Sequence, residues 1–266
     1  MEHAIQGTPL GQPDATNRDA NGPPVRWTQE FGVHSFDVDF RRHASIETVC
    51  RFFMEAAWNH AEALGFGFSH LAAQGKVWVL SRLSVRVVRN PQWGETVCVR
   101  TWPRATKSVF AMRDFQLLSG AGDVMASGAS AWLVLDANSR RPQRPERVLS
   151  RVPALPAERA LPEDPEKIPA VAASPGGPPF RVRYSDLDVN NHVNSCRYLR
   201  WVLDAYPVEF HAAHIVAQLE ANYLGETHAG EALALRSDTA DASVHAHCLT
   251  KADNGTEVCR VRLTWR

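Results

Sequence analysis

The feature that most constrains the fold is an order of elements that occurs twice along the chain. Each half begins with a short extended segment, continues with an apolar pattern at helical spacing, and ends in four strand-like runs. This order predicts an α+β fold in which each helix packs on an antiparallel sheet. The predicted strands are 77–88, 96–103, 108–119 and 125–135 in the first half, and 215–224, 231–238, 243–251 and 256–265 in the second.

The starts of these elements carry local signals. We expect the extended segments at 31–40 and 180–184. Ser45 can cap the first helix through the backbone N–H of Thr48. The second helix is expected to begin at Asn194 or Ser195, with Pro207 ending or following it.

A proline-rich stretch separates the two halves. Eight prolines lie between residues 153 and 179, and proline lacks the backbone donor that helices and central strands need. We therefore expect domains at 26–150 and 176–266, joined by a linker at 151–175 that lies over a surface. Residues 1–25 have the composition of a disordered polar tail.

Charge and cysteine content exclude several classes of protein. The 266-residue chain balances 29 basic against 29 acidic residues, so nucleic acid is not an expected partner. Five irregularly spaced cysteines favour a reducing compartment, and no apolar run is long enough for a membrane span. The N-terminal residues lack a secretory signal pattern, so a cytoplasmic location is expected.

Metal and cofactor signals are weak. The close histidine pairs, His211 with His214 and His245 with His247, lack a matching second pair of ligands. No metal site and no cofactor are therefore expected.

Polar groups are concentrated at residues 186–194, Asp-Leu-Asp-Val-Asn-Asn-His-Val-Asn. Asp188, Asn190 and His192 alternate, so in an extended segment their side chains would share one face. Glu226 follows in Tyr-Leu-Gly-Glu-Thr, before a Gly-Glu turn. Such a concentration between apolar elements indicates a functional site.

Each of these residues also has a structural interpretation. Asp188 or Asn194 could cap the second helix, and Asn190 could be a turn residue. His192 could be a structural histidine and Glu226 an ordinary residue at a strand end. Their joint occurrence favours catalysis, whereas capping is favoured for Asn194.

The two halves can be aligned on this motif. The spacing Asp39-x-x-x-His43 precedes the first helix as Asp188-x-x-x-His192 precedes the second, and Gly94-Glu95 aligns with Gly230-Glu231. In this register Arg41 stands where the second half has Asn190, and Asn90 stands where it has Glu226. We therefore expect chemistry in the second half and a structural role for Asp39 and His43.

The chain resembles the plant and bacterial acyl-acyl carrier protein thioesterases, which carry two tandem hotdog domains. The resemblance extends from about Phe31 to the C-terminus. It is strongest in the 186–194 motif and the following Tyr198, Trp201 and Leu203. In the first half it rests on the segments 45–48, 57–60, 90–97 and 129–136 and on Arg140-Arg141.

The resemblance implies a tandem hotdog fold, in which each sheet wraps a long helix and the two sheets join edge to edge. It also implies hydrolysis of acyl-acyl carrier protein (acyl-ACP) to free fatty acid in fatty acid biosynthesis. The catalytic residues carried over are Asp188, Asn190, His192 and Glu226. Family members often have a cysteine after this glutamate, but Thr227 stands here, so a Cys–His mechanism is not expected.

The resemblance also predicts where the substrate binds. The acyl chain would enter the first half between its helix and sheet, and the candidate lining residues, which could equally be plain core, are Phe52, Phe53, Ala56, Trp78 and Trp132. The acidic carrier would dock on a basic surface, and the densest cluster is Arg140, Arg141, Arg144 and Arg147. Arg181, Arg183, Arg197 and Arg200 lie nearer the catalytic motif in sequence. A solvated arginine-rich loop is the structural alternative.

Each catalytic residue has an expected task. Glu226 would activate water or attack directly, and Asn190 would orient the water or the glutamate. Asp188 would orient His192, which would polarise the thioester or protonate the departing thiolate. The oxyanion would lie near the N-terminus of the helix that begins around Asn194.

Two other functions fit the same residues less well. A thioesterase for coenzyme A esters would need the same catalytic groups and differ only in its substrate handle. A non-catalytic acyl-binding hotdog protein would not need all four polar residues. Hotdog proteins commonly dimerise through their sheets, but a tandem chain already supplies two domains, so monomer and homodimer both stay open.

Overall fold

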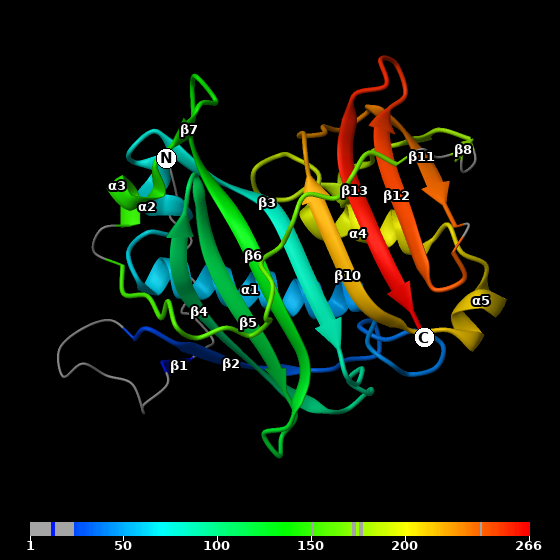
Figure 1. The fold of residues 1–266 in the computed structure, drawn as a ribbon, viewed down its shortest axis with the longest axis horizontal. Coiled ribbons are helices and arrows are strands. Elements are labelled where there is room, and N and C mark those ends of the chain that lie inside the picture. The colour runs from blue at the N-terminus through cyan, green and yellow to red at the C-terminus, as the bar shows by residue number, and fades with distance from the viewer. Residues whose placement is uncertain (1–11, 14–23, 150–151, 172–173, 176–177, 240) are drawn as a thin grey trace.

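The computed structural model describes residues 12–13, 24–149, 152–171, 174–175, 178–239 and 241–266. Strands from both halves form one antiparallel sheet. The long helices α1 (Ile46–Ala63) and α4 (Ser195–Leu203) lie on the same face of that sheet (Figure 1). Residues 1–11 and 14–23, most of the expected tail, are outside the described residues, as are 151 and 172–173 of the expected linker.

The main strands of the two halves follow the predicted order, with β9 (Phe180–Arg181) of only two residues where the second half was expected to begin. Those of the first half are β2 (Trp27–Gly32), β3 (Lys76–Val87), β4 (Thr96–Lys107), β5 (Phe110–Leu118) and β6 (Val124–Asp136). Those of the second half are β9 (Phe180–Arg181), β10 (Val216–Tyr223), β11 (Ala232–Asp238), β12 (Val244–Lys251) and β13 (Glu257–Trp265).

Several short elements were not predicted from the sequence. They are the strands β1 (Gln12–Pro13), β7 (Pro142–Gln143) and β8 (Ser174–Pro175), the helices α2 (Phe68–Ala72), α3 (Pro145–Leu149) and α5 (Val208–Ala213), and the 3₁₀ turn Tyr184–Asp186. All are six residues or shorter, so they carry too little periodicity to be recognised.

The two halves join edge to edge through β3 and β10. The strand order is β2-β4-β5-β6-β3 in the first half and β10-β13-β12-β11 in the second, with β9 also paired to β11. The order of one half is therefore the reverse of the other, as a two-fold relation between duplicated units requires. At the junction Arg86 pairs with Gln218 and Arg82 with Asn222. This arrangement is the predicted tandem hotdog.

The caps of both helices are those that the sequence predicts. The Ser45 side chain accepts a hydrogen bond from the Thr48 N–H at 3.1 Å, and α1 begins one residue later. The Asn194 side chain accepts from the Cys196 N–H at 2.9 Å at the start of α4. Capping satisfies amide donors that the first helical turn leaves without a partner.

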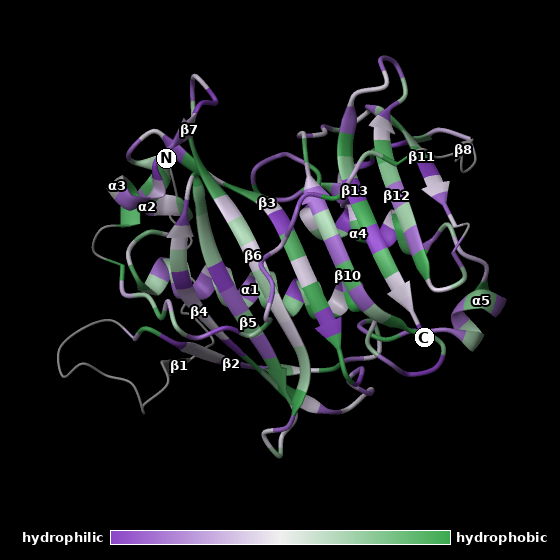
Figure 2. Ribbon diagram, viewed as in Figure 1, coloured by the Kyte–Doolittle hydropathy of each residue, from purple (hydrophilic) through white to green (hydrophobic). Residues whose placement is uncertain are grey.

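One hydrophobic core runs through both halves. It includes Val49 and Phe53 of α1, Leu199 of α4, and buried residues of the strands on both sides of the β3–β10 junction. The strands alternate between hydrophobic and hydrophilic residues, so that one face is directed to the helices (Figure 2). Because α1 and α4 also contact each other, neither half buries its helix independently of the other.

Both extended segments expected before the helices are shorter than predicted. Strand β2 ends at Gly32, and the rest of the predicted strand at 31–40 is a mixture of turn and irregular chain. An aspartate terminates each segment: the Asp37 side chain accepts from the His34 N–H at 3.0 Å, and Asp186 accepts from the Arg183 N–H at 2.7 Å. Such side-chain to backbone bonds compete with strand pairing, which a period-two pattern does not reveal.

The described part of the linker runs across the sheet face that is turned away from the helices (Figure 1). Leu161 and Ile168 are buried there. The Asn222 side chain accepts from the Ile168 N–H at 2.7 Å and donates to the Glu166 carbonyl at 2.9 Å. The linker therefore has fixed contacts with the sheet along its middle part.

A buried histidine, His60, connects α1 to the sheet and to the start of the first half. Its Nδ1 accepts from the Arg113 guanidinium at 3.0 Å, and its Nε2 donates to the Pro24 carbonyl at 2.9 Å. Arginine can only donate and a carbonyl can only accept, so these partners define the neutral Nε2–H tautomer. Burial, with the nearby Arg113 charge, lowers the pKa of His60 from 6.5 to about 3.

This low pKa predicts a loss of stability in acid. Between pH 6.5 and about 3 the unfolded chain protonates this histidine and the native protein does not, so the free energy of unfolding falls as pH falls through that window. We expect urea unfolding midpoints to show a weaker pH dependence there in a His60→Gln variant. The exposed His70→Gln variant is the control, and equal pH dependence in wild type and His60→Gln would contradict the prediction.

Candidate active site

The central part of the 186–194 motif is a tight turn and not an extended segment. Leu187 and Val193 form a β-bridge, and inside it the Asp188 N–H donates to the His192 carbonyl at 2.9 Å. The Asn191 N–H donates to the Asp188 carbonyl at 3.0 Å, and Asn191 has a left-handed backbone with φ of 60°. Asp188, Asn190 and His192 therefore belong to one turn and do not share the face of an extended strand.

The Asp188 carboxylate organises this turn. It accepts a hydrogen bond from the Asn190 N–H at 2.8 Å. The Asn190 side chain is exposed to solvent. Among the described residues, no hydrogen bond joins the side chains of Asp188 and His192. Desolvation and the His228 charge lower the pKa of His192, and the negative charge of Asp188 offsets part of this decrease.

Glu226 lies beside His192, as the spacing suggested. The chain leaves β10 and returns past the turn, where the Val193 N–H donates to the Thr227 carbonyl at 2.9 Å. This bond places the Glu226 Oε2 atom 3.7 Å from the His192 Nε2 atom. That distance suits an ion pair when the imidazole is protonated, but it is too long for a hydrogen bond.

Arg140 approaches the same carboxylate from the other half of the chain. Its guanidinium is hydrogen-bonded to the Glu226 Oε1 atom and forms an ion pair with it. Arg140 lies in the turn between β6 and β7 and has a left-handed backbone with φ of 56°. Asp136 holds this turn, since its side chain accepts from the Ser139 N–H at 2.8 Å and its carbonyl accepts from the Arg140 N–H at 2.9 Å.

The arginines grouped in the sequence therefore have different surroundings. Arg140 contacts the candidate catalytic glutamate, whereas Arg141 and Arg144 are exposed at the surface nearby. The side chain of Arg147 is outside the described residues. A sequence cluster could not distinguish them, because only the tertiary fold brings the turn between β6 and β7 next to Glu226.

His228 is a neighbour of this site that the sequence did not single out. Its ring lies edge-on to that of His192, with 4.8 Å between centroids. Desolvation lowers the pKa of His192 below 6.5, and the charges of His228 and Arg140 lower it further. The position of His228, two residues after Glu226, is the sequence signal that could have identified it as part of the site. His192 is therefore neutral at neutral pH.

Among the described residues, His192, Glu226 and His228 form the group that could hold a metal ion. Ligand atoms of His192, Glu226 and His228 all lie within 4.8 Å of one another. A metal ion at this group would have to compete with the Arg140 guanidinium for the Glu226 carboxylate.

The first half repeats the turn almost bond for bond. The Asp39 N–H donates to the His43 carbonyl at 2.9 Å, and the Arg42 N–H donates to the Asp39 carbonyl at 2.9 Å. Arg42 has φ of 64°, and the Asp39 side chain accepts from the Arg41 N–H at 2.9 Å. This repetition supports the register in which Asp39 corresponds to Asp188 and His43 to His192.

The side chains of the first-half turn make structural contacts. The Arg41 guanidinium folds back onto Asp39 at 2.8 Å and also donates to the His214 carbonyl at 2.9 Å in the second half. Asn90, the counterpart of Glu226, donates to the Ala44 carbonyl at 2.8 Å. In the first half, Arg41 thus stands in place of Asn190, and Asn90 stands in place of Glu226.

Thr227 directly follows the candidate catalytic glutamate. It is fully buried, and its hydroxyl is 2.7 Å from the Tyr198 hydroxyl of α4. This bond fixes the start of the loop after Glu226 to the helix. The thiols of Cys50, Cys196, Cys248 and Cys259 are free, and burial raises the pKa of the Cys196 thiol to about 12, so this thiol is not an activated nucleophile.

The amide groups at the start of α4 are mostly engaged. The Asn194 N–H donates to the Asp186 carbonyl at 2.9 Å, the Cys196 N–H donates to the Asn194 side chain, and the Arg197 N–H donates to the Asn194 carbonyl at 2.8 Å. The expected oxyanion position at this helix end therefore has fewer free donors than the sequence suggested.

The candidate acyl-pocket residues fall into two groups. Phe52, Phe53 and Ala56 are buried on α1 in the main core, where Phe53 stacks on Phe115 with 4.8 Å between ring centroids. Trp78 instead packs at a separate cluster near α2, edge-on to Trp132 with 6.4 Å between centroids. The two groups are thus spread along the first half.

Fold and site together define a tandem hotdog protein with a polar cluster built around Glu226. The acyl-ACP thioesterase N-terminal domain family matches residues 24–150, and the acyl-ACP thioesterase C-terminal domain family matches residues 175–266. The chain belongs to the acyl-ACP thioesterase family.

Relatives of known name cover almost the whole chain. A chloroplastic palmitoyl-acyl carrier protein thioesterase of Gossypium hirsutum is 28% identical over an alignment 262 residues long, which covers 90% of this chain and 63% of that protein. A chloroplastic oleoyl-acyl carrier protein thioesterase of Arabidopsis thaliana is 25% identical, over 91% of this chain and 76% of that protein. The chain thus spans 63% of the length of the cotton enzyme.

Solved structures of the same family superpose over the full fold. An acyl-ACP thioesterase from Bacteroides thetaiotaomicron has a TM-score of 0.82 and 26% identity, and covers 91% of this chain and 98% of its own. A 12:0-ACP thioesterase from Umbellularia californica has a TM-score of 0.78 and 25% identity, over 91% and 97%. Among the described residues, no helix is long and apolar enough to cross a membrane.

Proposed function

We propose that this protein hydrolyses the thioester of acyl-acyl carrier protein and releases a free fatty acid. The observation that carries the proposal is the meeting of His192, Glu226 and Arg140 at one point between the halves. The names of the relatives support the same reaction class. The second half supplies the catalytic turn, and the first half supplies Arg140 and the acyl pocket.

The proposed chemistry begins at Glu226. Its carboxylate takes a proton from water, which attacks the thioester carbon, while Arg140 holds the other carboxylate oxygen in place. Asn190, exposed beside the turn, orients the water or the incoming thioester. The neutral ring of His192 accepts this proton from Glu226 and, as an imidazolium, gives it to the departing thiolate, and the Asp188 turn fixes the position of that ring.

The acyl chain is proposed to enter the first half along α1. Phe53 and Ala56 lie on the buried face of the helix, and Phe52 stacks on Phe31 with 4.6 Å between centroids. Trp78 and Trp132 lie further along, at the α2 end of the sheet. Bulky groups at these positions would limit the length of the bound chain.

The carrier protein is proposed to dock beside the turn between β6 and β7. Arg141 and Arg144 are exposed there, and an acidic carrier would be attracted to this surface before the thioester reaches Glu226. We further propose a cytoplasmic location, since an odd number of irregularly spaced cysteines favours a reducing compartment.

The test exploits the duplicated turn. We expect His192→Ala to lower kcat for acyl-ACP hydrolysis by about 10²-fold or more, because proton transfer by a positioned side chain contributes that much. His43→Ala removes the matching imidazole of the first half and is expected to change kcat little. Single-turnover assays with matched acyl-ACP and acyl-CoA substrates would measure both variants.

The outcomes separate the competing functions. Hydrolysis of acyl-CoA without acyl-ACP turnover would identify a coenzyme A thioesterase of the same fold. Equal losses in His192→Ala and His43→Ala would refute the assignment of catalysis to the second half. Tight acyl retention without hydrolysis by the wild type would identify an acyl-binding protein.

A further inference from the structure

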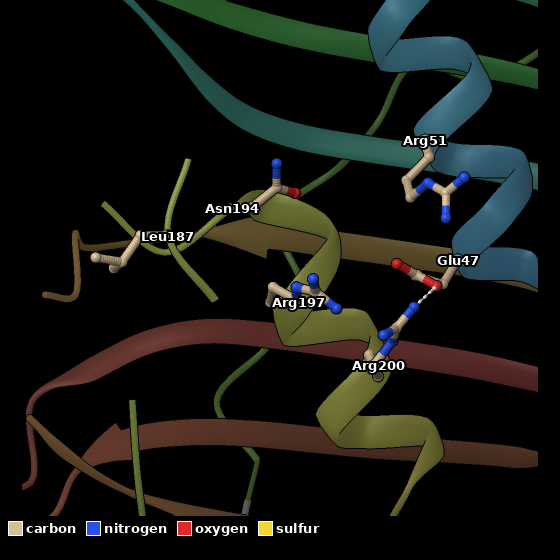
Figure 3. Close-up of a pocket in the computed structure, with 6 residues that line it drawn as sticks. All are labelled: Glu47, Arg51, Leu187, Asn194, Arg197 and Arg200. Carbon is tan, nitrogen blue, oxygen red and sulfur yellow. Dashed lines mark hydrogen bonds and ion pairs between the residues drawn. The ribbon is translucent and has the colours of Figure 1, made fainter. Parts of the chain in front are cut away.

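A polar pocket lies between the two long helices, next to the catalytic turn. It has a volume of about 190 Å³ and is lined by Glu47, Arg51, Leu187, Asn194, Arg197 and Arg200 (Figure 3). Two of these residues come from α1 and two from α4, so the pocket exists only when the halves are joined. It is smaller than the sites that enclose drug-sized ligands, and its size suits a small charged group.

Three guanidinium groups surround this space, with one carboxylate among them (Figure 3). Arg200 is paired with the buried Glu47 at 2.8 Å, and Arg51 is paired with the buried Asp37 at 2.7 Å. The Arg197 side chain makes no hydrogen bond or ion pair with the described residues. One positive charge of the pocket is therefore left for a ligand, and a singly charged oxyanion would neutralise it.

The wall of the pocket is shared with the candidate active site. Leu187 and Asn194 line it, and these residues directly precede and follow the segment that carries Asp188 and His192. Leu187 also forms the β-bridge that closes the catalytic turn. A ligand in the pocket would thus sit beside the turn that holds the reacting groups, and could belong to the same substrate molecule.

We propose that this pocket binds the phosphodiester of the phosphopantetheine arm that links the acyl group to its carrier. The inference rests on the proposed function. In that arm the phosphodiester is the one ionised group, and the chain between it and the thioester is uncharged. A guanidinium offers paired donors that match two phosphate oxygens, and no described residue accepts from those donors on Arg197. Arg51 and Arg200 keep their own partners and add positive potential.

The experiment compares two small substrates that differ only in the phosphate. One is an acyl-pantetheine, and the other is the same acyl arm as its methyl phosphodiester. We expect wild type to favour the phosphodiester by about 10- to 100-fold in kcat/KM, the effect of a hydrogen-bonded charged group. In Arg197→Gln this ratio should fall close to one. Arg236→Gln, a change at an exposed arginine of β11, should keep the wild-type ratio.

The alternative results are distinct. A ratio near one in wild type, or an unchanged ratio in Arg197→Gln, would overturn the phosphodiester site while leaving the hydrolase proposal intact. A loss confined to carrier-linked substrate would assign the pocket to an acidic side chain of the carrier, and would also overturn the proposal.

A binding measurement keeps the inference testable if no substrate is hydrolysed. Calorimetry would compare the methyl phosphodiester of phosphopantetheine and pantetheine itself, both without an acyl group, in wild type and Arg197→Gln. Tighter binding of the phosphodiester that disappears in the variant would support the site although the hydrolase function had failed. Equal binding of both compounds by wild type would overturn it.

Discussion

Glu226→Gln is expected to lower kcat for acyl-ACP hydrolysis by about 10²- to 10⁴-fold, the contribution of a positioned general base. Glutamine keeps the size of the side chain and one oxygen for Arg140, but it cannot take a proton from water. Because the change leaves the turn and the ion-pair partner in place, KM should change much less than kcat. Single-turnover hydrolysis measures the chemical step directly.

Glu95→Gln provides the control for this experiment. Glu95 lies in the first-half turn that aligns with Gly230-Glu231, where its carboxylate accepts from the Gln92 N–H at 3.2 Å and pairs with Arg89. Its replacement should leave kcat near the wild-type value. Retention of more than about a tenth of wild-type kcat in Glu226→Gln would mean that another group activates the water.

Phe53→Ala is expected to destabilise the protein by about 3–5 kcal/mol, the usual cost of removing a buried phenyl ring. Phe53 is fully buried, stacks on Phe115, and fills the space above Gly128. A Cβ atom at position 128 would lie only 2.8 Å from the Phe53 ring, so the helix and sheet are in close contact there. Urea unfolding would measure the change in free energy.

The exposed Phe36 is the matched control. It is 77% exposed, and Phe36→Ala should change stability by no more than about 0.5 kcal/mol. A small loss in Phe53→Ala would instead indicate that the sheet and helix already separate easily at this point, as a pocket that opens for an acyl chain would require. Gly128→Ala should be less destabilising in the Phe53→Ala background than in wild type, because the ring that it would meet is gone.

Much of the fold could be predicted because it is encoded locally. The strands from β3 to β6 and from β10 to β13 follow apolar runs bounded by turns, and Ser45 and Asn194 cap the helices as their side chains allow. The predicted strand at 31–40 failed because an aspartate side chain competes for backbone donors, a contact that a pattern of apolar positions does not contain.

The candidate site, like the fold, could be predicted only in part from the sequence. Asp188, Asn190, His192 and Glu226 could be selected from a motif and a spacing, although the reason first given for their proximity was wrong. His192 and Glu226 come together because the Val193 N–H bonds to the Thr227 carbonyl across two segments far apart in sequence. No local pattern predicts such a bond.

By itself the sequence determined a duplicated α+β architecture, the two helix caps, and the half of the chain that carries the full polar set. Only the tertiary structure decided that Arg140 contacts Glu226, that His228 lies against His192, and that three arginines from two helices form one pocket. Caps and strand periods depend on neighbouring residues. Contacts between the halves depend on how the β3–β10 junction orients two helices and two sets of loops, which no single segment encodes.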